Sequence, residues 1–137
     1  MYRVSPNAEW ILKYVQSVSH MIPKIKKLRS LSIKKPHPNW LNHCHGLTTE
    51  LDGQFHIMLH SHWNVVMSRN PIVTKAAPYS IIDTLVVLAH ELSHMVHWLH
   101  TPKHKELESQ IMIKFMRILE KDGYHSEEKD KGAKFYH

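Results

Sequence analysis

The residues of this chain with the most recognisable chemistry are His90, Glu91 and His94, which form the pattern HExxH. On a helix, positions four apart lie on the same face, so the two imidazoles could reach one metal ion at about 2.0–2.1 Å. Glu91 would lie beside these ligands, where a carboxylate can accept a proton from a metal-activated water. The pattern therefore predicts a Zn²⁺ site for hydrolysis, with Glu91 as the general base.

A catalytic zinc site takes three protein ligands, so a third residue must join the two histidines. His100 stands ten positions after His90, where the chain must turn before Thr101–Pro102, and we expect it to be that ligand. His97 continues the helical face of the motif, but it lies about 10 Å along the axis from His90 and should stay outside the site. The alternatives follow in the next helix: His104, Glu106 and Glu108.

Two helices are predicted to position these residues. Ser80, with Asp83 three positions later, is typical of a helix start and precedes the apolar run 85–89, so the motif falls on a buried helix. Thr101–Pro102 is a second helix start, and that helix should end near Gly123. Its predicted inner face consists of apolar residues at helical spacing: Leu107, Ile111, Phe115, Ile118 and Leu119.

The residues before the motif predict a helix followed by strands. Ser5–Pro6 begins an apolar series at helical spacing that should break near Pro23. Alternation around Leu31 and Ile33 then predicts a short strand. Asp52–Gly53 favours a two-residue hairpin between 45–51 and 54–60, with Phe55, Ile57 and Leu59 on one face. Residues 65–77 show no clean period and are predicted to form a loop over the site. The elements together indicate an α+β fold.

Length and composition favour a single domain over residues 1–137, with a polar tail at 124–137. Cys44 is the only cysteine, which excludes an internal disulfide and indicates a reducing, cytoplasmic setting. The first residues lack a secretory pattern, and no apolar run approaches the roughly 18 residues that span a bilayer. We therefore expect neither secretion nor membrane insertion.

The formal charge of +6 includes a cluster of basic side chains between positions 24 and 35. Such a cluster can contact phosphates without reading a base sequence, although a charge run is more often a solvated surface. We expect it to allow non-specific contact with DNA. Its members are Lys24, Lys26, Lys27, Arg29, Lys34 and Lys35.

With these residues in view, positions 84–107 resemble the SprT-like zinc metallopeptidases and the related YgjP-type metal-dependent hydrolases. The segment His100-Thr101-Pro102-Lys103-His104 occupies the place of an H-G-x-x-F segment in SprT-like proteins, with Thr101 in place of glycine and His104 in place of phenylalanine. Metzincins have glycine where this chain has His97, and the cysteine zinc ribbon of many SprT-like proteins is absent.

The resemblance implies a zincin-like α+β fold with an N-terminal helix, a small antiparallel sheet with a hairpin, an HExxH helix and a C-terminal helix. It also implies a minimal, catalytic-domain-only peptidase of the kind found in bacteria and phages, which would act in the host cytoplasm if phage-encoded. A protein or peptide would be the substrate, and DNA-associated proteolysis is known in the SprT-like group.

Two other functions are compatible with the sequence. YbeY-type endoribonucleases also space three histidines at zero, four and ten, but their second motif position is not glutamate. A protein that retains zinc only for stability and acts by binding is the other alternative.

Overall fold

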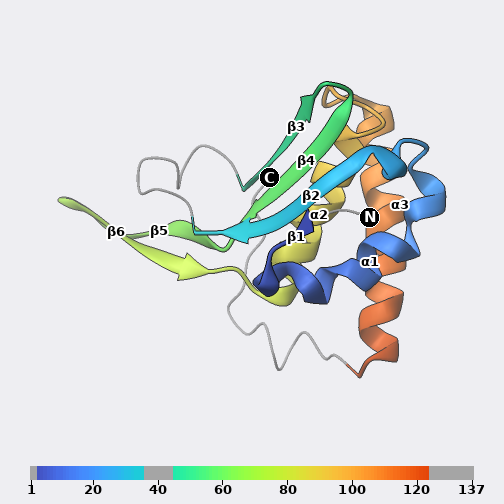
Figure 1. Ribbon diagram of the computed structural model, residues 1–137. Helices are drawn as coiled ribbons and strands as arrows, with labels where there is room; N and C mark the ends of the chain where they lie inside the picture. The colour runs from blue at the N-terminus through green and yellow to red at the C-terminus, as the bar shows by residue number, and fades with distance from the viewer. Residues whose placement is uncertain (1–2, 36–44, 124–137) are drawn as a thin grey trace.

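A computed structural model describes residues 3–35 and 45–123, and it has two layers (Figure 1). A four-stranded sheet forms one layer, and the helices cover one of its faces. A separate two-stranded ribbon extends away from this body. No helix among the described residues is long and apolar enough to cross a membrane. The predicted tail at 124–137 lies outside the described residues.

The sheet has the strand order β1-β2-β4-β3. Its strands are β1 (Arg3–Val4), β2 (Leu28–Lys34), β3 (Gly46–Leu51) and β4 (Gln54–His60). The β3–β4 hairpin is confirmed, and Asp52 and Gly53 both adopt positive φ in its turn. The sheet is mixed, however, and the antiparallel sheet of the prediction is wrong, because β2 pairs in parallel with both β1 and β4. Those pairings join residues far apart in the chain, which local patterns do not report.

The N-terminal helix is confirmed but is shorter than its apolar series. Helix α1 covers Leu12–Ser17 and is preceded by a 3₁₀ helix over Pro6–Ile11. The Ser17 hydroxyl donates to the Tyr14 carbonyl, and that of Ser19 donates to Gln16. Serine hydroxyls that bind nearby carbonyls compete with helix hydrogen bonds, so the chain continues as short 3₁₀ turns at Ser19–Met21 and Ile25–Lys27.

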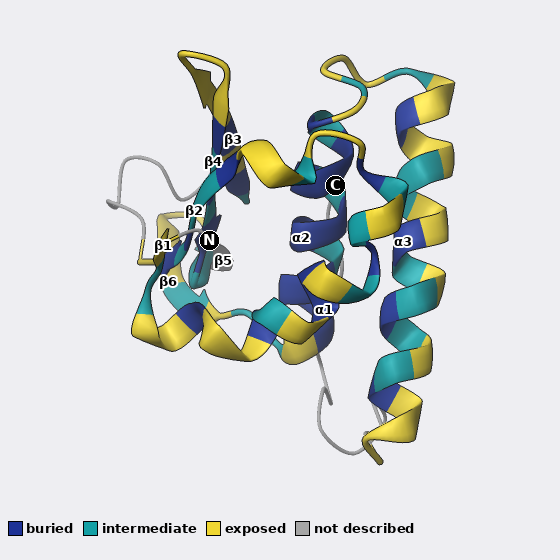
Figure 2. Ribbon diagram, turned by 45° about the vertical axis from the view of Figure 1, so that its right-hand side comes forward, coloured by how far each residue is buried: buried dark blue, intermediate teal, exposed yellow. Residues whose placement is uncertain are grey.

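The two C-terminal helices are confirmed with the predicted caps. Helix α2 (Ile81–His94) begins at Ser80, whose side chain accepts from the Asp83 N–H. Helix α3 (Pro102–Lys121) begins at Thr101, whose hydroxyl accepts from the His104 N–H. Figure 2 shows that α2 is buried along most of its length, between the sheet and the other helices. Because α2 is buried in this way, the direction in which its motif residues point is fixed by packing.

The apolar core lies between the sheet and the helices. Leu31, Phe55 and Ile57 contribute to it from the sheet, and Leu88 and Phe115 from α2 and α3. Each of these five side chains is at most 2% exposed. The faces predicted from alternation on β4 and from helical spacing on α3 are therefore the buried ones.

The loop predicted over residues 65–77 is wrong. These residues form most of an antiparallel ribbon of β5 (His62–Arg69) and β6 (Ile72–Pro78), joined by a turn at Asn70–Pro71. The residues from 69 to 75 are all exposed, so no face of the ribbon tip is buried. Alternation of apolar and polar residues arises where one face of a strand is covered, and its absence here hid both strands.

Candidate metal centre

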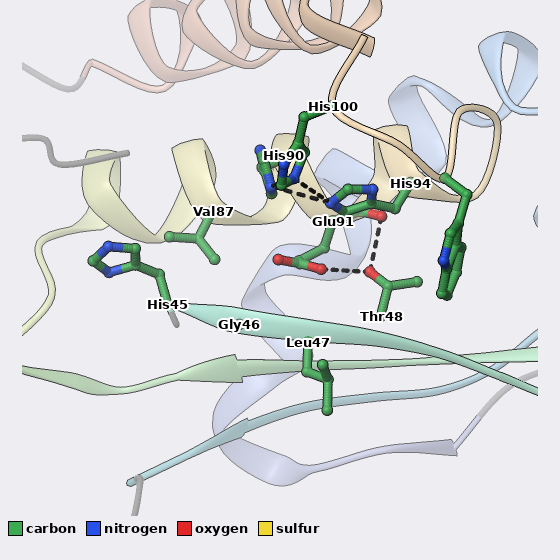
Figure 3. Close-up of a pocket in the computed structure, with 10 residues that line it drawn as sticks. His45, Gly46, Leu47, Thr48, Val87, His90, Glu91, His94 and His100 are labelled. Carbon is green, nitrogen blue, oxygen red and sulfur yellow. Dashed lines mark hydrogen bonds between the residues drawn. The ribbon is translucent and has the colours of Figure 1, made fainter. Parts of the chain in front are cut away.

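Helix α2 and the turn that follows it bring three imidazoles together. His90 and His94 lie on successive turns of α2, and His100 reaches them from the segment before α3 (Figure 3). Their three Nε2 atoms are mutually 3.1 Å apart. Nitrogens bound at about 2.0–2.1 Å to one tetrahedral ion lie roughly 3.3 Å apart, so the triangle has the size that one ion requires.

Hydrogen bonding alone does not account for this triangle. Each Nε2 atom carries either a hydrogen or a lone pair, and a hydrogen bond needs one of each. Among three such atoms, at least one pair must therefore place two hydrogens or two lone pairs against each other. A cation that accepts all three lone pairs removes this conflict, so the geometry fits a metal ion.

Glu108 of α3 orients the first of these rings. The Nδ1 atom of His90 lies 2.6 Å from Glu108 Oε1, so an ionised Glu108 accepts the hydrogen of Nδ1 and leaves a lone pair on Nε2. Metal-binding histidines commonly have such a carboxylate on their other nitrogen. Glu108 was weighed above as a ligand, but the structure places it behind the ring of His90, which is itself a ligand candidate. Glu106 is exposed on α3.

His104 is the fourth member of the histidine group. One ligand atom from each of the four residues lies within 4.8 Å of the others, so the group could hold a metal ion. His104 is 1% exposed, and its Nε2 atom lies 3.2 Å from the His90 carbonyl oxygen, to which it can donate. That contact supports the backbone of a ligand candidate. His97 is not part of the group.

The pKa values of the four rings are pulled in different directions. The hydrogen bond to Glu108 raises the pKa of His90, against the effect of burial. Burial, followed by the charge of His90, lowers the pKa of His94 and of His100. Burial and the charges of His94 and His90 lower the pKa of His104 to about 4. His104 is therefore neutral near pH 7.

Glu91 points from α2 toward the edge strand of the sheet. It is 5% exposed, and its Oε1 atom lies 2.6 Å from the hydroxyl of Thr48 on β3. The same hydroxyl lies 3.0 Å from the Glu91 carbonyl oxygen. Burial raises the pKa of the Glu91 carboxyl, whereas the Thr48 hydrogen bond and the His90 charge lower it. Glu91 is thus held by a second element as well as by its own helix.

A glycine allows β3 to approach α2 this closely. A Cβ atom on Gly46 would lie 2.9 Å from Val87 Cγ1, 3.1 Å from the Met58 carbonyl oxygen and 3.3 Å from Glu91 Cγ. Any larger residue would therefore push against backbone as well as side chains. Sequence reasoning missed Gly46 and Thr48, since neither carries a local pattern that points to α2.

These groups border one cleft of about 530 Å³. Histidine and glutamate side chains lie on the α2 side, β3 forms the opposite wall, and Trp98 contributes an apolar rim that is 53% exposed. His45 also lines the cleft, and its Nδ1 contacts the hydroxyl of Tyr79. The cleft therefore combines a histidine group that could hold a metal ion with a carboxylate and room for a ligand.

Comparison of the chain with known protein families, curated proteins and solved structures gives no significant match. The likeness to SprT-like and YgjP-type proteins consequently rests on the motif and its spacing. The structure supports an α+β protein with a four-histidine group on and between α2 and α3 that could bind a metal ion.

Proposed function

We propose that this protein is a zinc-dependent hydrolase of peptide bonds, with His90, His94 and His100 as ligands and Glu91 as the general base. The observation that carries the proposal is the triangle of Nε2 atoms at 3.1 Å, bordered in the same cleft by a buried glutamate. Imidazole suits zinc as a ligand, and three protein ligands leave a position for the reaction.

Each residue then has a distinct task. A bound zinc ion would supply Lewis acidity and lower the pKa of a coordinated water to about 7. Glu91 would take the proton of the attacking water and deliver it to the leaving nitrogen. Thr48 keeps the carboxylate of Glu91 in place through the 2.6 Å hydrogen bond, and Glu108, by accepting from Nδ1 of His90, would leave the Nε2 lone pair of that ring available to hold an ion.

The substrate would bind along β3. Strand β4 has no free edge for a peptide, because it pairs with β2 on one side and β3 on the other. The outer edge of β3 pairs with no strand within 3–35 and 45–123, and β3 lines the cleft. A peptide that added there as a further strand would run past the metal group.

The deciding experiment compares the wild type with Glu91→Gln after loading with one equivalent of Zn²⁺. We expect the wild type to cleave an unstructured protein such as casein and to lose this activity with a zinc chelator. Glu91→Gln should bind zinc with the same stoichiometry and cleave at least about 100-fold more slowly, because general-base catalysis contributes roughly 10²–10⁴-fold.

Other outcomes would reject the proposal. Equal cleavage by both proteins would remove Glu91 from the mechanism. Chelator-sensitive degradation of RNA, with intact casein, would favour the endoribonuclease. Zinc binding without hydrolysis of either polymer would leave a zinc-stabilised binding protein.

A further inference from the structure

The cleft of the candidate metal centre runs lengthwise between β3 and α2. Gly46 at the start of β3 lies against Val87, whereas Thr48 is hydrogen-bonded to Glu91, further along α2. Two strand residues advance about 6.6 Å and four helix residues about 6.0 Å, so the strand and the helix keep pace. In Figure 3 the residue numbers of both elements rise in the same direction along the cleft. A polypeptide paired with β3 would therefore meet the α2 residues one after another.

The two ends of this cleft differ in chemistry. His45 lies at the end where β3 begins, and its Nδ1 contacts the hydroxyl of Tyr79, which precedes α2. Trp98 lies at the opposite end, beyond the last turn of α2, with its ring centroid 6.1 Å from that of His94. A bound polypeptide would therefore meet polar side chains on one side of the histidine group and an indole ring on the other.

The Trp98 end of the cleft is apolar and open. Three apolar residues of the turn between α2 and α3 are exposed: Val96 is 36%, Trp98 53% and Leu99 70% exposed. The described residues that line the cleft include no Lys, Arg or Asp, and Glu91, their one carboxylate, is hydrogen-bonded to Thr48. Exposed apolar side chains that border a cleft commonly mark a binding site. This end of the cleft suits an uncharged, apolar part of a ligand.

We propose that Trp98 selects polypeptides that place a large apolar side chain, such as that of Phe or Leu, beside the bond to be cleaved. This selection rests on the proposed peptidase function and names its class of substrate. A Phe side chain against the indole ring removes apolar surface of both from water, and aromatic pairs gain further from edge-to-face contact. An Asp side chain in the same place would lose water and meet the negative face of the indole ring.

The same requirements define the state of the substrate. Pairing with β3 needs backbone N–H and C=O groups that have no other partner, and packing on Trp98 needs an apolar side chain that lies open. In folded proteins most buried backbone groups are paired, and large apolar side chains are mostly buried. A segment that offers both belongs to a chain that is unfolded at that place. The substrate class is therefore unfolded polypeptide that contains large apolar residues.

The test measures binding of short fluorescent peptides to the zinc-loaded Glu91→Gln protein by anisotropy. This variant lacks the proposed general base, so bound peptides stay intact. The peptides consist of Ala, Gly and Ser and differ only at one central position, which is Phe, Ser or Asp. The Phe peptide should bind at least about tenfold more tightly than the other two, because burial of a Phe side chain contributes about that factor or more.

The measurement is repeated in variants of Glu91→Gln that also change one tryptophan. Trp98→Ala should bring the affinities for the three peptides within about twofold of one another, whereas Trp98→Phe should retain the preference for Phe. Trp10→Ala is the matched control, because Trp10 is exposed on the 3₁₀ helix Pro6–Ile11 and does not line the cleft. The zinc content of each variant is measured, so that a loss of metal is distinguished from a loss of peptide contact.

Three results would overturn the role of Trp98: no binding of the Phe peptide, equal affinity for all three peptides, or equal loss of preference in Trp98→Ala and Trp10→Ala. Casein cleavage by the wild type at bonds without an apolar neighbour, mapped by mass spectrometry, would also reject this role and leave the hydrolase standing. Conversely, a preference for Phe that depends on Trp98, without cleavage of casein, would support recognition by Trp98 and reject the hydrolase.

Discussion

Glu91 in the cleft of the candidate metal centre and Ile72 on the β5–β6 ribbon have opposite surroundings. Glu91 is 5% exposed and hydrogen-bonded to Thr48 on another element, whereas Ile72 is 76% exposed and belongs to no part of the core. Chemistry at a fixed point requires side chains that packing and hydrogen bonds hold in place. The molecule thus separates a rigid cleft from an exposed ribbon, and substitutions in each should behave differently.

Apart from Glu91, the proposed general base, the largest effect is expected at Glu108. Glu108→Gln removes the negative charge behind His90, and loss of such a partner typically weakens metal binding 10–100-fold. Glu106→Gln, on the exposed side of the same helix, is the matched control and should change nothing. Competition with a chromophoric zinc chelator measures both affinities. Equal affinities in the two variants would show that Glu108 does not support the ligand.

A smaller effect is expected at Thr48. Thr48→Val keeps the shape of the side chain and removes the hydrogen bond to Glu91. Loss of this hydrogen bond should lower kcat about tenfold, because buried hydrogen bonds to charged groups contribute roughly 1.5–3 kcal/mol. The KM and the zinc stoichiometry of this variant should equal those of the wild type. Thr48→Ser should restore kcat, and Thr49→Val on the exposed face should leave it unchanged. A fall in zinc content together with kcat would instead indicate a structural role.

The smallest effect is expected on the ribbon. Ile72→Ala should change the free energy of unfolding by no more than about 0.5 kcal/mol, because the side chain is exposed. The same substitution at Ile57, which is 1% exposed, should cost about 2–5 kcal/mol. Urea unfolding followed by circular dichroism measures both. A large decrease in the free energy of unfolding for Ile72→Ala would mean that the ribbon packs against the body.

The two regions also differ in how far the sequence predicts them. Helix α2 and its motif follow from local rules, because Ser80 caps the first turn and the buried residues recur at helical spacing. The turn to His100 could be anticipated from Thr101–Pro102, which starts a new helix. Most of the candidate site can therefore be predicted from the spacing of the ligand candidates along one short segment.

The remaining features depend on contacts between distant residues. Thr48 and Glu91 are 43 positions apart, and their meeting depends on how β3 packs on α2. Glu108 stood among the candidates, but only the packing of α3 distinguishes a ligand from a support. The ribbon strands contain many β-branched residues, which favour strands, yet residues 69–75 at the tip are all exposed, so no alternation was present there to reveal a strand.

The hydrogen bond between Thr48 and Glu91 would couple ligand binding along β3 to the position of the Glu91 carboxylate. Thr48 lies on β3, the outermost strand of the sheet. A ligand bound along β3 would therefore restrain or displace Thr48, whose hydroxyl is hydrogen-bonded to the Glu91 carboxylate. In the proposed mechanism, occupancy of the outer edge of β3 and alignment of Glu91 as the proton acceptor are thereby linked through the side chain of Thr48. A polypeptide that pairs fully with β3 would align the Glu91 carboxylate as it binds, whereas a short or incompletely paired one would leave that carboxylate unaligned.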